Sequence, residues 1–375
     1  MPGAPLPTIS SLLKALFWRR KPEVKWFDGG PDFMTRYYSH GRMALAEGIK
    51  AVMKSGRYDS ATVFVPDYIC NDALEILRIM PIAIIYYPII EDLSPDWYRL
   101  KEICAREKGL KLFLLVHYFG FPNRMEEAVM FCENNNMVLI EDGAHMLKPQ
   151  IHARKGPLMI FSPRKLLPLS SGGVLVIQKQ FGKYLGDMKR SDTVREDVTW
   201  ICSMILQKCL IKFCIPWKTL RRFREETRNH EGAPERYHSK MGLCGKFALK
   251  MLADAEDDLE ETARRRRNNY SRIASRIAGL KGVRVLSPLV AEDACPYVFP
   301  LIIEEGAKLL LGLFESIGIP AAQWPCLPPE VLDTGDKHGT ALWVKDHLLL
   351  LPLHQSLSLD DADVIGSTLC GSIPS

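Results

Sequence analysis

No stretch of this sequence stays apolar for the roughly 18 consecutive residues that a transmembrane helix requires. A secretory signal is also missing. The amphipathic stretch at residues 6–27 has a short apolar part, and charge rather than a small-residue cleavage site follows it. The ten cysteines form no CxxC pair and no Cys/His spacing typical of zinc sites. We therefore expect reduced thiols, no metal site and a cytoplasmic location.

A strong charge of either sign is absent as well. The formal net charge is +5, which does not by itself argue for a nucleic-acid partner. It suits an anionic small substrate or a weak contact with an acidic membrane surface. The run Arg264–Arg267 is basic, but acidic residues lie one to two turns before it. We therefore interpret it as a solvated, internally paired helix face and expect no nucleic-acid binding.

Hydrophobic residues make up 47% of the chain and charged residues 25%, which is the balance of a soluble globular protein. Short, continuously apolar segments alternate with segments of helical period. This alternation is typical of buried parallel strands joined by crossover helices, and it predicts an α/β fold with a mainly parallel sheet. The predicted strands are residues 61–66, 82–89, 110–120 and 137–142, and the predicted helices are 42–56, 71–80, 94–109 and 124–136.

The pattern changes to helix after Trp200, and strand-like segments return near the end of the chain, at 297–303 and 347–353. This change predicts a second, smaller α+β domain, which the length of the chain can accommodate. The predicted divisions are an N-terminal amphipathic segment (1–34), a large domain (35–254) and a small C-terminal domain (255–375).

The segment 200–224 is rich in apolar residues, has Trp200 and Trp217 near its ends, and finishes in a basic cluster. These features allow an interfacial helix on a membrane surface. Lysines interrupt the apolar run, and they favour the alternative of a buried helix or a dimer contact. We prefer the dimer contact and keep weak membrane contact as the second interpretation.

Side chains that can take part in catalysis or ligand binding follow the predicted strands, where α/β proteins commonly form their sites. Gly41 lies where a helix is predicted to begin, and the free backbone N–H groups at a helix start can bind a phosphate group. Each residue alone is a weak signal, because Asp142 could simply cap a helix and Lys165 could be a surface charge. The strand-end candidates are His117, Asp142, His145, Ser162 and Lys165.

Taken together, these residues match one chemistry. A sheltered lysine amine condenses with an aldehyde cofactor. An aspartate paired with a protonated pyridine nitrogen keeps the cofactor ring an electron sink. A serine and a helix start hold a phosphate group. These are the parts of a site for pyridoxal 5'-phosphate (PLP).

Four motifs resemble the PLP-dependent sugar aminotransferases of the DegT–StrS group, over roughly residues 35–370. "HYFGFPNRMEEAVMFCENNNMVLIEDGAH" is similar to the stretch that carries the family's Glu-Asp element. "PRKLLPLSSGG" matches its Pro-x-Lys followed by Gly-Gly, and "LLLLPLHQSLSLDDADVI" its C-terminal segment. "DDLEETARRRRNNYSRI" resembles its long interdomain helix. The resemblance implies the fold-type I architecture of PLP-dependent transferases.

The resemblance also implies roles for single residues. Lys165 is the lysine that binds PLP, Asp142 is the partner of the pyridine nitrogen, and His145 stands near the cofactor. Ser162 is implied as a phosphate ligand, as are Gly41 and Arg42, where Arg42 replaces the family's threonine. Cys70 replaces an aromatic that often stacks on the ring, so Tyr68 or His117 would have to supply stacking. His238-Ser239-Lys240 stands where the family has Asn-x-Arg.

The function implied is transamination from glutamate to a nucleotide-linked keto-sugar, in cell-surface polysaccharide or related glycan biosynthesis. The family's site lies between two subunits, so the resemblance implies a homodimer. A PLP-dependent dehydratase or lyase is the alternative within the fold, and Lys165 argues against it because a histidine replaces the lysine in the dehydratase branch. A third interpretation is a cofactor-binding regulatory protein that has lost catalysis, which the altered phosphate turn favours.

Overall fold

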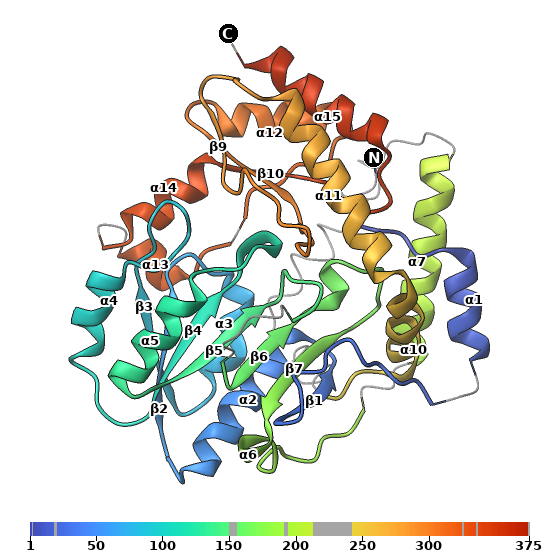
Figure 1. The fold of residues 1–375 in the computed structure, drawn as a ribbon. Coiled ribbons are helices and arrows are strands. Elements are labelled where there is room, and N and C mark those ends of the chain that lie inside the picture. Colours follow the sequence, from blue (N-terminus) through green and yellow to red (C-terminus); the bar gives the residue numbers. More distant parts are fainter. Residues whose placement is uncertain are drawn as a thin grey trace.

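A seven-stranded sheet forms the centre of the molecule (Figure 1). Its strand order is β1-β7-β6-β5-β4-β2-β3, and β7 runs in the opposite direction to the other six strands. The strands are β1 (Phe33–Tyr38), β2 (Ala61–Pro66), β3 (Ile82–Tyr87), β4 (Lys111–Val116), β5 (Met137–Gly143), β6 (Leu158–Phe161) and β7 (Gly173–Gln178). The computed structural model describes residues 1, 3–18, 21–149, 156–190, 194–212, 242–324, 326–334 and 337–373. The expected α/β fold with a mainly parallel sheet is confirmed.

Helices cover both faces of this sheet. Because the crossovers are right-handed, connections that run in opposite directions across the sheet place their helices on opposite faces. Helices α4 and α5 lie on one face, and α2 and α3 pack together on the other. Four crossover helices were predicted within a few residues of their observed bounds. They are α2 (Gly41–Ser55), α3 (Asn71–Arg78), α4 (Trp97–Cys104) and α5 (Met125–Asn135).

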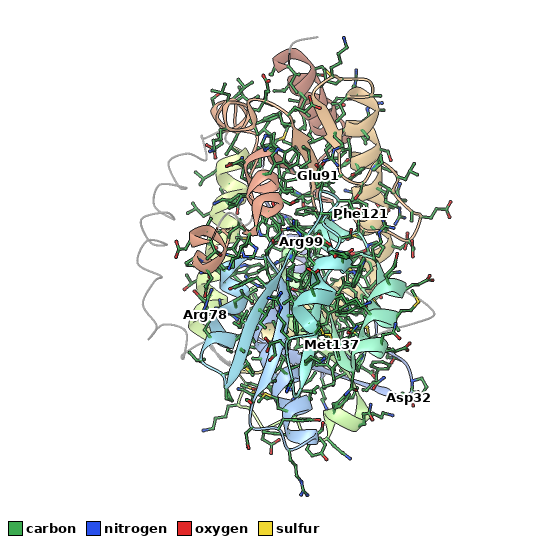
Figure 2. The ribbon with its side chains drawn as sticks, turned by 90° about the vertical axis from the view of Figure 1, so that its left-hand side faces the viewer. Asp32, Arg78, Glu91, Arg99, Phe121 and Met137 are labelled. Atoms are coloured by element: carbon green, nitrogen blue, oxygen red, sulfur yellow. The ribbon has the colours of Figure 1, made fainter. Side chains whose placement is uncertain are left out.

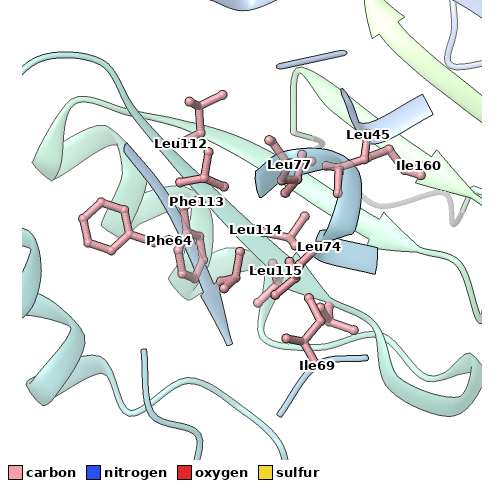
Figure 3. Close-up of a cluster of buried hydrophobic side chains, with 14 of the residues drawn as sticks. Leu45, Phe64, Ile69, Leu74, Leu77, Leu112, Phe113, Leu114, Leu115 and Ile160 are labelled. Atoms are coloured by element: carbon pink, nitrogen blue, oxygen red, sulfur yellow. The ribbon is translucent and has the colours of Figure 1, made fainter. Parts of the chain in front are cut away.

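The main core lies between the sheet and these helices. Figure 3 shows Leu45 of α2 and Leu74 and Leu77 of α3 packed against apolar side chains of the strands. All six residues of β2 are buried, which accounts for a sequence in which Thr62 is the one polar residue. The sheet is therefore a rigid platform that fixes the positions of the residues at its strand ends.

The C-terminal part contains a second, antiparallel sheet with the order β10-β9-β8. Its strands are β8 (Val283–Val285), β9 (Phe299–Ile303) and β10 (Leu348–Leu351). Alternate residues serve different cores: Leu349 and Leu351 pack into a core of the C-terminal part, whereas Leu348 and Leu350 belong to the main core. The predicted α+β character of this part agrees with these elements, and the division at residues 254/255 stays a prediction. Its helices are α11 (Leu259–Arg276), α12 (Ala307–Ser316), α13 (Pro329–Asp333), α14 (Gly339–His347) and α15 (Leu359–Ser372).

The carboxyl ends of the parallel strands face this C-terminal part. Figure 2 shows Met137, the first residue of β5, low in the molecule, and Phe121, which follows β4, closer to the C-terminal helices. Glu91, after β3, forms an ion pair of 2.9 Å with Arg284 of β8. Any chemistry at these strand ends therefore occurs where the two sheets approach each other.

One side of the molecule is built from the N-terminal helix α1 (Ile9–Phe17) and from α7 (Val194–Lys212) and α10 (Lys246–Asp254) (Figure 1). Leu12 and Ala15 of α1 are buried in a cluster against which Trp200 of α7 also packs. A separate N-terminal segment with its boundary at residue 34 stays a prediction. Within the described ranges, no helix combines the length and the apolar character needed to cross a membrane.

The described part of segment 200–224 is the second half of α7, and residues 213–224 lie outside the described residues. This half is not a buried helix, because Ile205 is 47% exposed and Leu206 is 50% exposed. Its polar Gln207, by contrast, is buried. The helix thus presents apolar side chains outward, and the interpretation as a fully buried helix is wrong for this part.

Candidate functional site

Asp142 occupies the end of β5, next to the end of β4. The backbone N–H of His117 donates to the Asp142 carbonyl at 3.0 Å, and the Asp142 Oδ1 atom accepts from the Ala144 N–H at 2.9 Å. Burial raises the pKa of the Asp142 carboxyl, and the positive charge of Lys165 and the Ala144 N–H act in the opposite direction. The carboxylate is therefore held half-buried at the strand edge, in the field of the lysine.

Lys165 is half-buried at the end of a short 3₁₀ turn, η2 (Pro163–Lys165), which follows β6. Pro163 starts the turn, and the Lys165 N–H closes it on the Ser162 carbonyl at 2.9 Å. Burial lowers the pKa of the Lys165 amine, and the Asp142 carboxylate opposes that shift. The described contacts include no direct ion pair between the two groups, so their charges interact across a separation.

The pair Gly172-Gly173 explains how this turn meets the start of α2. A Cβ atom added at Gly173 would lie 2.1 Å from the carbonyl carbon of His40 and 2.4 Å from the Gly41 nitrogen, so only glycine fits there. Gly172 has a φ of +150° and donates its N–H to the Ser39 carbonyl at 2.8 Å. The glycines therefore let β7 pass directly against the amino end of α2.

This approach places Ser162 beside Gly41. A Cβ added at Gly41 would lie 3.5 Å from the Ser162 Cβ and 3.7 Å from the Ser162 hydroxyl oxygen. Gly41 is the first residue of the 15-residue helix α2, whose first backbone N–H groups and dipole favour an anion. Arg42, the next residue, forms an ion pair of 3.6 Å with Glu75 of α3. The arrangement can hold a phosphate group with a hydroxyl and backbone donors.

His145 is 3% exposed and lies between two aromatic rings. Its ring stacks on Tyr297, with centroids 4.8 Å apart, and on Phe119 at 5.8 Å, while Trp324 meets it edge-on at 5.1 Å. The Phe119 N–H donates to Nδ1 at 3.2 Å, so the neutral ring carries its proton on Nε2. Burial, and secondarily the charge of Lys165, lowers the His145 pKa.

Sequence reasoning missed Phe119, Tyr297 and Trp324 as members of this site. Phe119 has a local signal only in the structure: its φ of 58° is unusual for a bulky residue. Tyr297 and Trp324 lie more than 150 residues beyond His145 in the sequence, in the C-terminal part, and nothing in their local sequence indicates the contact.

The buried His117 has both ring nitrogens engaged by the protein. Its Nδ1 accepts from the Asn123 N–H at 2.9 Å, and its Nε2 lies 3.4 Å from Oε2 of Glu141. Glu141 in turn accepts a hydrogen bond from the Gly156 N–H. The ring edge of His117 therefore belongs to a network behind the strand ends, and stacking on a cofactor through its face stays a prediction.

The buried Tyr68 lies between the two parts of the chain. Its hydroxyl donates to the Trp324 carbonyl, and its own carbonyl accepts from the Tyr118 hydroxyl at 2.7 Å. Cys70 precedes α3, where burial raises the pKa of its thiol and the Lys165 charge lowers it. The stacking role expected for Tyr68 stays a prediction.

The structure thus gathers Asp142, His145, Ser162, Lys165 and the start of α2 at one edge of the sheet. His238-Ser239-Lys240 lies outside the described residues. Across the ranges that the structure covers, no group of three His, Cys, Asp or Glu side chains is arranged to hold a metal ion.

Comparison of the sequence with family models and with curated proteins finds no match. Comparison of the structure with solved structures does find similar folds. Helicobacter pylori PseC, an aminotransferase involved in the biosynthesis of pseudoaminic acid, superposes with a TM-score of 0.70 at 12% identity, covering 99% of this chain and 97% of the other. A DegT DnrJ EryC1 StrS aminotransferase from Brucella abortus gives 0.65 at 14% identity, with coverages of 98% and 95%.

The E. coli GDP-4-keto-6-deoxy-D-mannose-3-dehydratase, solved with bound hydrated PLP, gives a TM-score of 0.67 at 16% identity and covers 98% of both chains. At these identities the likeness establishes the fold over almost the whole length of each chain. The fold-type I architecture expected from the motifs is therefore confirmed.

Proposed function

We propose that this chain is a PLP-dependent aminotransferase of the DegT–StrS type, which moves an amino group from glutamate to a nucleotide-linked keto-sugar. The observation that carries the proposal is the placement of Asp142 and Lys165 at the carboxyl ends of the adjacent strands β5 and β6, where their charges act on each other, next to the anion seat formed by Ser162 and Gly41. The names of the solved structures support it, because two are aminotransferases and a third binds PLP.

The residues present fit this cofactor. Asp142 is a half-buried carboxylate, whose charge a protonated pyridine nitrogen would pair with. Ser162 and the first N–H groups of α2 would hold the phosphate, with Gly41 allowing close approach, and His145 would flank the ring. When bound, PLP supplies an aldehyde that condenses with amines and a ring that withdraws electrons.

Lys165 has two tasks in this proposal. Its lowered pKa makes the neutral amine available at a lower pH than for an exposed lysine, and only the neutral amine can attack the aldehyde. The same Nζ atom would take a proton from the substrate carbon and return it. The Asp142 carboxylate would hold a proton on the ring nitrogen, and the aromatic side chains around His145, which are Phe119, Tyr297 and Trp324, would exclude water.

The experiment is borohydride reduction of the purified protein in the presence of PLP, followed by peptide mass spectrometry. We expect a pyridoxyl mass on Lys165 and none after Lys165→Ala. The exposed Lys148, which follows the His145 segment, provides the matched control, since Lys148→Ala should label like the wild type. A label at another lysine, or no label at saturating cofactor, would refute the proposal.

A dehydratase of the same fold is the second candidate, favoured by the likeness to the E. coli enzyme. Lys165 argues against it, and incubation with glutamate separates the two. Formation of 2-oxoglutarate with loss of PLP absorbance indicates an aminotransferase. A protein that binds PLP without this half-reaction would instead be a dehydratase or a regulatory protein. The regulatory interpretation is favoured by the ion pair between Arg42 and Glu75, because Arg42 replaces the family's threonine and its charge is already engaged by the protein.

We further propose a cytoplasmic homodimer that acts in polysaccharide or related glycan biosynthesis. Support for a dimer contact comes from α7, where residues spaced by three or four share one exposed face. The face consists of Val198, Cys202, Ile205, Leu206 and Cys209. Such spacing suits pairing with another helix. Weak contact of the same face with an anionic membrane is the alternative.

A further inference from the structure

The four arginines Arg264–Arg267 do not form one solvated face. Arg264 and Arg265 are exposed and pair with Glu261 at 2.7 and 2.8 Å, as predicted. Arg267 pairs with Glu260 at 2.7 Å. Arg266, however, is 0% exposed, so the expectation of a solvated face is wrong at this position. Helical spacing turns this one side chain inward, from α11 toward the strand ends of the large sheet.

Arg266 makes four hydrogen bonds, all to neutral acceptors. Its Nη1 atom donates to the carbonyls of Pro296 (3.1 Å) and Tyr297 (2.9 Å), and its Nη2 atom to the Leu166 carbonyl at 2.9 Å. Its Nε atom donates to the Gln355 side-chain oxygen at 2.9 Å. Burial lowers the pKa of the guanidinium because none of these partners carries a compensating charge. Burial of this charge costs free energy, and the four hydrogen bonds that the guanidinium donates compensate for that cost.

The Leu166 carbonyl links the turn that carries Lys165 to the C-terminal part of the chain. Inside the turn, the N–H groups of Leu166 and Leu167 bond to the Pro163 carbonyl at 3.0 and 2.8 Å. The Leu166 carbonyl instead accepts two bonds from the C-terminal part, from Arg266 and from the Gln355 amide at 3.0 Å. Both anchors therefore act on the residue directly after the lysine.

The same guanidinium also contacts the aromatic wall of the site, which is formed by Phe119, Tyr297 and Trp324 around His145. Tyr297, whose carbonyl Arg266 binds, donates its own N–H to the Phe119 carbonyl at 2.7 Å, and its ring stacks on His145. One cation thus joins the lysine turn to the wall that encloses His145. The lysine turn, Phe119 and His145 follow strands of the large sheet, whereas Tyr297 comes from the C-terminal part of the chain.

We propose that Arg266, assisted by Gln355, is a positioning residue that fixes the direction of the Lys165 amine relative to the His145 wall. The consequence for catalysis rests on the proposed function, whereas the effect on the turn itself does not. A lysine cannot replace Arg266, because its single ammonium cannot span carbonyls on three separate segments.

The test compares Arg266→Met and Arg266→Lys with Arg264→Met, which removes a cation from an exposed position of the same helix. Covalent attachment of PLP to Lys165, trapped with borohydride over time, should slow by about 100-fold in both Arg266 variants. Binding of pyridoxamine phosphate, which has no aldehyde and cannot condense with lysine, should stay unchanged. Arg264→Met should match the wild type in both measurements.

Hydrogen exchange of the cofactor-free protein gives a second readout. The amides of Lys165, Leu166 and Leu167 should exchange faster in Arg266→Lys, and the same direction of change is expected for Gln355→Leu, which keeps the buried charge. Equal loss of PLP attachment and of pyridoxamine phosphate binding would indicate general damage and overturn the positioning role. Wild-type attachment rates with an unaltered turn would also overturn it. If the wild-type protein bound neither cofactor form, the proposed function would fail, and the exchange data would still decide the role of Arg266.

Discussion

Two regions of this molecule depart from the usual distribution of side chains, in opposite directions. At the edge of the large sheet, charged groups are withdrawn from water: Lys165 and Asp142 are half-buried and Arg266 is fully buried. Along α1 and α7, apolar groups face water instead, and Phe17 is 76% exposed. The first region loses hydration of its charges, and the second loses the gain of burying apolar surface.

The comparison indicates that each region is incomplete for a different reason. Buried charges are tolerated where a bound group can pair with them, so the sheet edge is suited to a polar ligand. An exposed apolar stripe is tolerated where another surface covers it, so α7 is suited to a partner. The predictions below disturb each region in turn.

The largest expected effect is that of Lys165→Ala. Amino transfer from glutamate should fall by about 10⁴-fold or more, because one group serves as both cofactor anchor and proton carrier. Stopped-flow absorbance of the glutamate half-reaction measures the loss, with Lys148→Ala as the control. A variant that retained a substantial rate would show that the buried lysine is only structural.

Asp142→Asn should lower the same rate by about 10³-fold while the protein stays folded. An amide can still accept the Ala144 N–H, but it cannot hold a proton on a pyridine nitrogen. Circular dichroism checks the fold and the half-reaction gives the rate. Near wild-type turnover would reduce Asp142 to an acceptor for one backbone N–H.

Replacing Ile205, Leu206 and Leu210 with serine tests the apolar region. The proposed dimer should dissociate to a soluble monomer, measured by analytical ultracentrifugation. Lys208→Ala changes a half-exposed polar side chain that lies on the side of the helix away from Leu206, so it is the control and should leave the dimer intact. A triple variant that stayed dimeric but no longer sedimented with anionic liposomes would instead favour the membrane interpretation.

The smallest expected effect is on the pH dependence of stability without cofactor. Burial raises the folded pKa of Asp142 above the ordinary value of an aspartate, so its contribution to stability is present below the unfolded pKa and is lost as pH rises through the folded pKa. Asp142→Asn should therefore gain stability relative to the wild type as pH rises across that interval. The gain should be about 1.4 kcal/mol for each pH unit that separates the unfolded and folded pKa values.

The contribution of Lys165 to stability changes with pH in the opposite direction. Burial lowers its folded pKa below the ordinary value of a lysine, so the unfolded chain binds more protons between the two pKa values, and stability rises with pH there. Lys165→Met should flatten that rise. Urea unfolding at several pH values measures both slopes, and a wild-type slope in either variant would show that the group is solvated rather than buried.

The sequence predicted the parts of this molecule whose signals are local. Continuous apolar runs identified the parallel strands, and the positions at or after their ends made Asp142 and Lys165 candidates, whose roles stay predictions. The family resemblance added the fold type. The Arg264–Arg267 run illustrates the limit: all four residues look alike in sequence, and only the angle of α11 against the sheet decides that Arg266 is inside. Tyr297 and Trp324 reach His145 through tertiary packing between distant segments, which no local pattern encodes.

The placement of β1 at the edge of the sheet has a consequence for how the chain reaches its native state. Among the strands that the structure describes, β7 alone lies beside it in the sheet, so residues 33–38 join that sheet only after residues 173–178 have been synthesised. The contact of Gly173 with the His40–Gly41 peptide forms in the same step, and the anchors from Arg266 and Gln355 come later still. Closure of such long loops slows folding. On the ribosome, the anion seat therefore cannot exist before about half of the chain has emerged, and the lysine turn is secured only when the chain is nearly complete.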